Sequence, residues 1–152
     1  MLKYSISKSI RAMKLRTDRK TGTGTEAELQ KRVHGLLKTI SKKYVIKWRW
    51  DSAGENIEGV NERSKLHQMN KNSRGYPDLT IYYNRRIFFL ELKREGVNLA
   101  SLLRANDAHI QEQFDLIKWF RKHGFCAAFA VGFHSAYQKI YAFIDNREID
   151  IF

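Results

Sequence analysis

The chain has 152 residues, 43% of them hydrophobic, and carries 28 Lys and Arg against 16 Asp and Glu, a formal net charge of +12. This length favours a single folded domain, and no apolar run approaches the roughly 18 residues of a membrane span. Cys126 is the single cysteine, which excludes a disulfide framework, and the start lacks a secretory pattern, so we expect a soluble, cytoplasmic protein. The charge favours a polyanionic partner, most simply nucleic acid, and the alternative is a merely soluble basic protein.

Residues 1–24 are strongly basic and close on Thr21-Gly-Thr-Gly. Such a composition buries little apolar surface, so we interpret this segment as an arm that precedes a domain at 25–152. An arm of this kind neutralises phosphates without reading sequence. The alternative is a terminus without a role. The arm residues that we assign to nucleic-acid binding are Lys14, Arg16, Arg19 and Lys20.

A helix is predicted to begin after Thr25, because Thr25 and Glu28 have the spacing of a capping box. The apolar stripe of this helix is Leu29, Val33, Leu36, Leu37 and Ile40. Stepping back seven residues from Val33 reaches Glu26, which we therefore expect to face inward. Its other reading is simple stabilisation of the helix N-terminus, which Glu28 already provides. Glu26 is thus a candidate third acid.

Alternation between Tyr44 and Trp50 predicts a strand with its tyrosine, isoleucine and tryptophans on one side. Residues 51–76 show no apolar period, and a loop of this length in a small domain is usually functional or disordered. Its end is rich in hydrogen-bond donors, and we interpret it as a substrate-facing loop. Lys71 and Arg74 there are predicted to bind nucleic acid, as is Arg94 further along the chain.

Two apolar runs flank Asn84-Arg85, which predicts a β-hairpin with a tight turn at these two residues. In that register Tyr83 pairs with Arg86, and Asp78 falls opposite Glu91. Like charges placed so are destabilising unless a cation lies between them, and a divalent metal is the obvious candidate. The strand period of two directs Lys93 to the same face as Glu91.

The alternative is an ordinary hairpin with a solvated Asp at one end and a surface Glu-Lys pair. Each half of the pattern is common by itself. Their shared register, within a run of buried apolar residues where unpaired charge is costly, favours a site.

After a loop at 95–105, a helix is predicted from about Asn106 to His123, with Gln113 on its inner apolar stripe. A buried Gln must find hydrogen-bond partners, so Gln113 is either satisfied by backbone or part of a site. We then expect a strand at 125–131, a turn at 132–134, a helix at 135–144 and an edge strand at 148–152. This order implies an α/β sandwich around a central mixed β-sheet flanked by helices.

Gly75-Tyr-Pro-Asp78 followed by Glu91-Leu-Lys93 resembles the PD-(D/E)XK nuclease superfamily. Gln113, together with Glu26 and Gln30, is similar to the virus-type replication-repair nuclease (VRR-NUC) branch. The resemblance covers about residues 25–144. It implies a restriction-endonuclease-like fold and phosphodiester hydrolysis that requires Mg²⁺ or Mn²⁺. It also implies that small members form homodimers that cut branched DNA such as Holliday junctions in replication, repair or recombination.

The resemblance implies a role for each motif residue. Asp78, Glu91 and Glu26, with the backbone carbonyl of Leu92, would hold the metal. Lys93 would orient a water or stabilise its deprotonated form. Gln113 would hold Lys93 or a phosphate oxygen.

Three functions remain open at this stage. The first is a DNA endonuclease that selects branched structures, of phage or nucleoid DNA. The second is a catalytically idle nucleic-acid-binding module, and the third is an RNA-processing nuclease with the same site. For a homodimer, the sequence offers the apolar residues of 137–143 with Ile149, Ile151 and Phe152, which serve equally well to complete a monomer's core.

Overall fold

The protein is described by a computed structural model that covers residues 24–51 and 75–152. The basic arm and most of the 51–76 loop therefore lie outside the described residues. The elements, in chain order, are α2 (Glu26–Ile40), β1 (Ile46–Trp50), β2 (Leu79–Tyr83), β3 (Arg86–Lys93), α4 (Leu99–Arg104), α5 (Ala108–Lys122), β4 (Cys126–Val131) and α6 (Gly132–Ile144). In the part of the chain that is described, no helix is long and apolar enough to cross a membrane.

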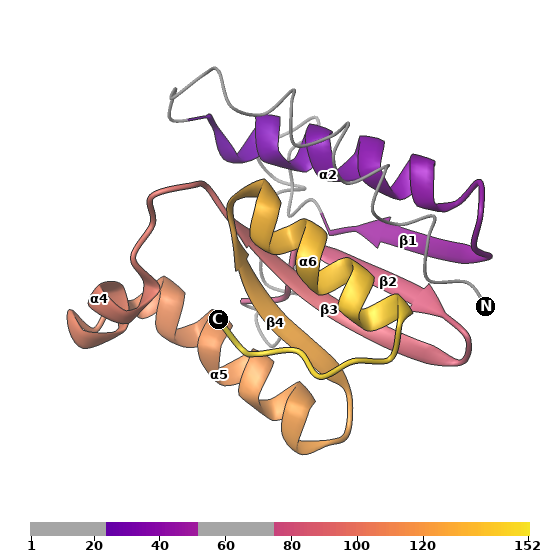
Figure 1. Cartoon of the computed structure of the whole chain (residues 1–152). Coiled ribbons are helices and arrows are strands. Elements are labelled where there is room, and N and C mark those ends of the chain that lie inside the picture. Colours follow the sequence, from indigo (N-terminus) through magenta and orange to yellow (C-terminus); the bar gives the residue numbers. More distant parts are fainter. Residues whose placement is uncertain (1–23, 52–74) are drawn as a thin grey trace, which may run out of the picture.

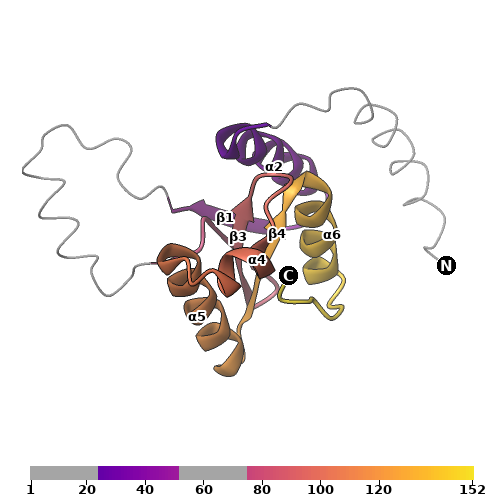
Figure 2. The ribbon, with the colours of Figure 1, turned by 90° about the vertical axis from the view of Figure 1, so that its left-hand side faces the viewer.

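Four strands form one sheet in the order β1-β2-β3-β4, antiparallel except for the parallel pair β3-β4. Helices α2 and α6 cover one face of this sheet, and α5 covers the other (Figures 1 and 2). The expected α/β sandwich around a mixed sheet is confirmed.

The predicted hairpin register is also confirmed. Tyr83 pairs with Arg86, and Leu79 pairs with Leu90, so the next step along both strands places Asp78 beside Glu91. The turn residues Asn84 and Arg85 have φ of 48° and 61°. Positive φ at both central residues is the backbone of the tight hairpin turn that keeps the strand twist, and Asn tolerates it well.

Strand alternation divides the apolar residues into two cores. The larger core lies beneath α2 and α6, and Trp48 and Trp50 of β1 pack against it from the sheet. The smaller core lies beneath α5 and takes its buried strand residues from β3 and β4: Phe89, Ala127 and Phe129. Because successive side chains point to opposite faces, Glu91 and Lys93 lie on the α5 face with Phe89.

The N-terminus of α2 has the predicted capping box, in which Thr25 accepts from the Glu28 N–H and Glu28 accepts from the Thr25 N–H. Two later expectations are wrong. The expected loop at 95–105 contains α4, whose N-cap Asn98 accepts a hydrogen bond from the Ser101 N–H at 3.0 Å. The expected turn at 132–134 belongs to α6, because Gly132, with φ of 76°, completes the change of direction alone.

The expected edge strand at 148–152 is not a strand. One ladder-like bond exists, from the Phe129 N–H to the Ile151 carbonyl at 2.8 Å. The rest of the tail is held by side chains, since Lys139 donates to the carbonyls of Asp150 and Phe152 at 2.6 and 2.7 Å. Ile149 is buried in the larger core. The tail thus packs against β4 and α6 of its own chain.

Candidate active site

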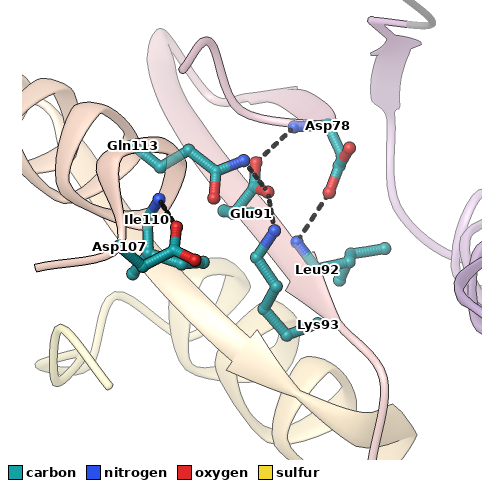
Figure 3. A network of polar contacts seen from close by, with 7 residues as sticks. All are labelled: Asp78, Glu91, Leu92, Lys93, Asp107, Ile110 and Gln113. Atoms are coloured by element: carbon teal, nitrogen blue, oxygen red, sulfur yellow. Dashed lines mark hydrogen bonds and ion pairs between the residues drawn. The ribbon is translucent and has the colours of Figure 1, made fainter. Parts of the chain in front are cut away.

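Asp78 and Glu91 are joined through both backbone and side chain at the end of the hairpin (Figure 3). The Asp78 N–H donates to Glu91 Oε2 at 3.2 Å, and the Leu92 N–H donates to Asp78 Oδ2 at 2.9 Å. Each carboxylate therefore lies against the other's strand. The predicted opposition of the two acids is present in the structure.

Glu91 is the buried centre of the site, with only 1% of its surface exposed. Its Oε1 lies 2.8 Å from Lys93 Nζ and accepts a second hydrogen bond from Gln113 Nε2 at 2.5 Å. The pKa of Glu91 is raised to about 7, first by burial and then by the charge of Asp78, while Lys93 acts in the opposite direction. A carboxyl group with a pKa near neutrality, in contact with a buried ammonium, is typical of a functional site.

The pKa of Asp78 is also raised, first by burial. The N–H of Leu92 and the charge of Lys93 lower it, and the charge of Glu26 raises it. Two neighbouring carboxyl groups with raised pKa values form a site in which a bound cation would favour ionisation of both.

Lys93 is buried with 7% of its surface exposed, and its ammonium points back along β3 toward Glu91 (Figure 3). A buried ammonium is costly unless it is paired, and its pairing with Glu91 meets that requirement. Lys93 therefore lies on the same face as Glu91, as predicted, and the two side chains form an ion pair.

Gln113 reaches the site from α5, on the far side of the smaller core from the hairpin. The residue is 5% exposed, and while its Nε2 donates to Glu91, its Oε1 is buried and has no hydrogen-bond partner among the described residues. Buried amide oxygens are almost always partnered, so an unpartnered one beside two acids marks a place for a ligand or water. The sequence predicts that Gln113 is either a core residue bonded to backbone or part of a site. Its amide bonds to the Glu91 side chain and not to backbone, so the first interpretation does not hold.

Gly75 explains how the loop before Asp78 reaches α5. A β-carbon at Gly75 would lie 2.8 Å from the Gln113 nitrogen and 2.8 Å from the Glu112 carbonyl carbon, and its φ is +77°. Only glycine allows this backbone contact. The sequence analysis quoted Gly75 as part of a motif but did not find this role, because no local pattern indicates which helix a loop will touch.

Glu26 differs from its prediction. It is exposed rather than inward, because it is the first residue of α2 and lies one turn before Leu29, where the buried stripe begins. Its charge nonetheless acts on Asp78 and raises the pKa of that group. No group of three or more acids, histidines or cysteines within metal-binding reach occurs in residues 24–51 and 75–152. The structure thus brings together two carboxylates, not three.

The remaining predicted residues are placed as follows. Arg94 is exposed directly after β3. Leu92 meets Asp78 through its N–H, and a role for its carbonyl stays a prediction. Lys14, Arg16, Arg19, Lys20, Lys71 and Arg74 lie outside the described residues. Asp51, which the sequence did not single out, joins the edge of the site because its N–H donates to the Asp78 carbonyl at 2.8 Å.

These donors fit a hard divalent cation. Mg²⁺ keeps several of its waters and is commonly held by one or two carboxylates together with substrate phosphates. Asp78 and Glu91 would supply two carboxylates, and the Gln113 oxygen, which has no partner among the described residues, would supply a neutral acceptor for a water. The fold and site together define an α/β domain with a paired-carboxylate and lysine site at one end of a mixed sheet.

Comparisons with known proteins give one similarity. No protein-family model matches the chain, and no curated protein matches it. Among solved structures, the chain is similar to one described as a "VRR_NUC domain protein", with 23% sequence identity and a TM-score of 0.47. The match covers 80% of this chain and 93% of the other.

Proposed function

We propose that the protein is a metal-dependent nuclease that hydrolyses phosphodiester bonds in DNA. The observation that carries this proposal is the contact set around Glu91. Its carboxylate meets the Asp78 N–H, the Lys93 ammonium and the Gln113 amide at once. Two acids, one buried lysine and one acceptor that is unpartnered among the described residues are groups that can support metal-assisted hydrolysis of a phosphodiester.

Asp78 and Glu91 would hold Mg²⁺ or Mn²⁺, which when bound activates a water and offsets the charge that develops on the phosphate. Glu26 is exposed at the start of α2, and its part in holding the metal stays a prediction. Its charge beside Asp78 suits a weaker role through an intervening water.

Lys93 would act on the attacking water. Its ammonium lies 2.8 Å from Glu91 Oε1, and this ion pair supports a fixed position for it at the site. A fixed cation there stabilises a deprotonated water and attracts the scissile phosphate.

Gln113 would act on the Glu91 carboxylate and on the reacting water. Nε2 donates to Glu91 and holds the carboxylate in one orientation. Oε1, which has no hydrogen-bond partner among the described residues, would accept one hydrogen bond from the water and so direct a lone pair of the water toward the phosphate. In this proposal Gln113 touches the reacting water.

DNA as the substrate is supported by the formal charge of +12 and by the resemblance of the motifs. Selectivity for branched DNA is the finer part of the proposal, and phage or nucleoid DNA is the expected context. Cleavage should be measured on linear duplex, flap, four-way junction, single-stranded DNA and RNA, with Mg²⁺ and with EDTA. Metal-dependent cleavage of DNA supports the proposal. Cleavage of RNA alone, or of nothing, contradicts it.

A homodimer is the expected form, because resolving a four-way junction needs two paired cuts and a two-fold pair of subunits supplies both sites. The surface suggested by the sequence is largely used within the monomer. Ile149 and Phe143 are buried, and Phe152 stacks on Phe114 with ring centroids 5.5 Å apart. Light scattering measures the oligomer, and a monomer that still makes paired cuts would contradict this part of the proposal.

A further inference from the structure

Among the described residues, α5 covers β3 and β4 on the face that carries the site, and no helix covers β1 and β2 there (Figure 2). The buried apolar residues beneath α5 come from β3, β4 and the helices, and β2 contributes only the polar Thr80 as a buried residue on this face. On this face β1 presents Lys47 and Arg49, both exposed, since Ile46, Trp48 and Trp50 pack against the opposite core. Lys47 pairs across the sheet with Tyr82, and Arg49 pairs with Thr80.

Two tyrosines expose their rings beside these cations. Tyr82 is 43% exposed and Tyr76 is 39% exposed. The Tyr76 ring stands edge-on against Phe89 and Phe120, with centroids 6.0 and 5.8 Å apart, so its orientation is fixed by the smaller core. The Tyr76 ring thus offers a surface that is already ordered, and the Tyr82 ring is exposed to a ligand.

These groups are close to one another as well as to the site. Burial raises the pKa of Tyr76, the charges of Asp51 and Tyr82 raise it further, and Arg49 lowers it, which is expected of side chains within electrostatic range. Asp51 follows Arg49 on the same face, 4.0 Å from its guanidinium, and bonds to the backbone of Asp78.

A hollow continues this surface beyond Tyr82, at the turn of the hairpin. Its volume is about 330 Å³, and its lining includes Val45, Tyr82, Arg85 and Ile87. Val45, directly before β1, is 89% exposed and adds an apolar side chain to this hollow. The size is at the lower end of small-ligand pockets.

The surface runs away from the carboxylates along the strands. Four residues separate Asp78 from Tyr82, about 14 Å at the rise of an antiparallel strand. A stacked DNA strand advances about 3.4 Å per nucleotide, so about four nucleotides span this distance.

We propose that the exposed β1-β2 face, formed by Lys47, Arg49, Tyr76, Tyr82 and Arg85, binds an unpaired strand of DNA that leads into the cleavage site. The tyrosines stack on bases, and the cations bind phosphates. A blunt duplex hides its base faces and gains only the phosphate contacts. This inference rests on the proposed function for its direction, toward Asp78 and Glu91.

A second copy of the chain is the less suitable occupant. It would bring a formal charge of +12 to a face that already presents cations, whereas a DNA strand neutralises them. The same reasoning favours a polyanion over a neutral protein surface.

Binding without catalysis tests the inference. Fluorescence anisotropy in EDTA should compare the full chain on a single-stranded oligothymidylate of about twenty nucleotides, a blunt duplex of that length and the corresponding RNA. Tyr82→Ala should weaken single-strand binding about fivefold to tenfold and leave duplex binding within about twofold. Tyr82→Phe, which keeps the ring, should bind as the wild type does.

Two double variants that each remove two positive charges distinguish binding at this face from general electrostatic attraction to DNA. Lys47→Ala with Arg49→Ala should reduce single-strand affinity and flatten its salt dependence. Lys31→Ala with Lys38→Ala removes the same charge from exposed positions on α2, across the sheet, and should have a smaller effect.

Four results would overturn the inference. Three concern Tyr82→Ala in the binding assay: an equal loss on duplex and single strand, no loss at all, or a loss on RNA alone. The fourth is self-association, seen by light scattering, that Tyr82→Ala abolishes. Asp78→Asn separates this inference from the proposed function, because it should stop cleavage and keep Tyr82-dependent binding. If the wild-type chain cuts nothing but its binding depends on Tyr82, only the proposed nuclease activity is refuted. If it cuts DNA but Tyr82→Ala has no effect on binding, only the strand-binding face is refuted.

Discussion

Gly75 and Gln113 are in backbone contact, so close that a β-carbon on Gly75 would stand 2.8 Å from the nitrogen of Gln113. The contact joins the loop that carries Asp78 to the helix that carries Gln113. Glu91 lies between them and bonds to both. The loop that carries Asp78 can therefore lie this close to α5 only because residue 75 is a glycine and has no β-carbon.

Gly75→Ala should consequently abolish cleavage and destabilise the fold by about 3 kcal/mol or more, from positive φ and overlap together. Gly96→Ala is the matched control, because Gly96 has φ of +86° but open space around it. That variant should lose only about 1–2 kcal/mol and keep its activity. Urea unfolding and a cleavage assay measure both effects, and equal behaviour of the two variants would refute the role of the contact.

Asp78→Asn and Glu91→Gln should each reduce cleavage with Mg²⁺ by about a thousandfold, since each removes a carboxylate from the metal site. DNA binding should be retained or improved, because negative charge is removed near phosphate. Asp115→Asn changes an exposed acid of α5 whose contact is with Gln111, and it should cut at the wild-type rate. Wild-type cleavage by either site variant would show that the metal site is wrongly assigned.

Gln113→Leu should lower the cleavage rate by about 10- to 100-fold with little change in the free energy of unfolding. The substitution removes the donor to Glu91, but it also removes the buried oxygen that has no partner, and these changes oppose each other in stability. Single-turnover kinetics and thermal unfolding of the same preparation test this. A large loss of stability with unchanged chemistry would make Gln113 a core residue.

Stability without divalent metal should fall as pH rises through neutrality. The pKa of Glu91 is about 7 in the folded protein against 4.5 for an exposed group, so the folded state binds the extra proton between these values. The contribution of Glu91 to the free energy of unfolding is therefore fully present below about pH 4.5. About 3 kcal/mol of that free energy is lost as the pH rises from there through 7.

Urea unfolding at about pH 5 and about pH 8 in EDTA, for wild type and Glu91→Gln, measures this contribution. The variant should lose that part of the pH dependence. Added Mg²⁺ should restore wild-type stability at the higher pH, because a ligand that binds only the folded state stabilises it. The same pH dependence in both proteins would contradict the assignment.

Deleting residues 1–20 removes seven basic side chains and one acid. Affinity should fall for every nucleic acid tested, and the slope of log K against log salt should flatten, because fewer counterions are released on binding. Preference among sequences should not change. Unchanged affinity and slope would show that the arm has no part in binding.

The sequence by itself determined the opposition of Asp78 and Glu91, the side on which Lys93 lies, and the capping of α2. All three follow from local rules, since a two-residue turn sets the register of a hairpin and the strand period sets the face. The apolar stripe of α5 likewise identified Gln113 as buried.

Only the tertiary structure decided which groups Gln113 would meet, that Gly75 would touch α5, and that Glu26 would remain exposed. These depend on how helices from distant parts of the chain pack on the sheet, which no local period contains. Helix packing also explains why, among the described residues, no helix covers β1 and β2 on the face that carries the site. The alternation in β1 placed Lys47 and Arg49 opposite Trp48, but only the packing of α5 over β3 and β4 left that face open beside the site.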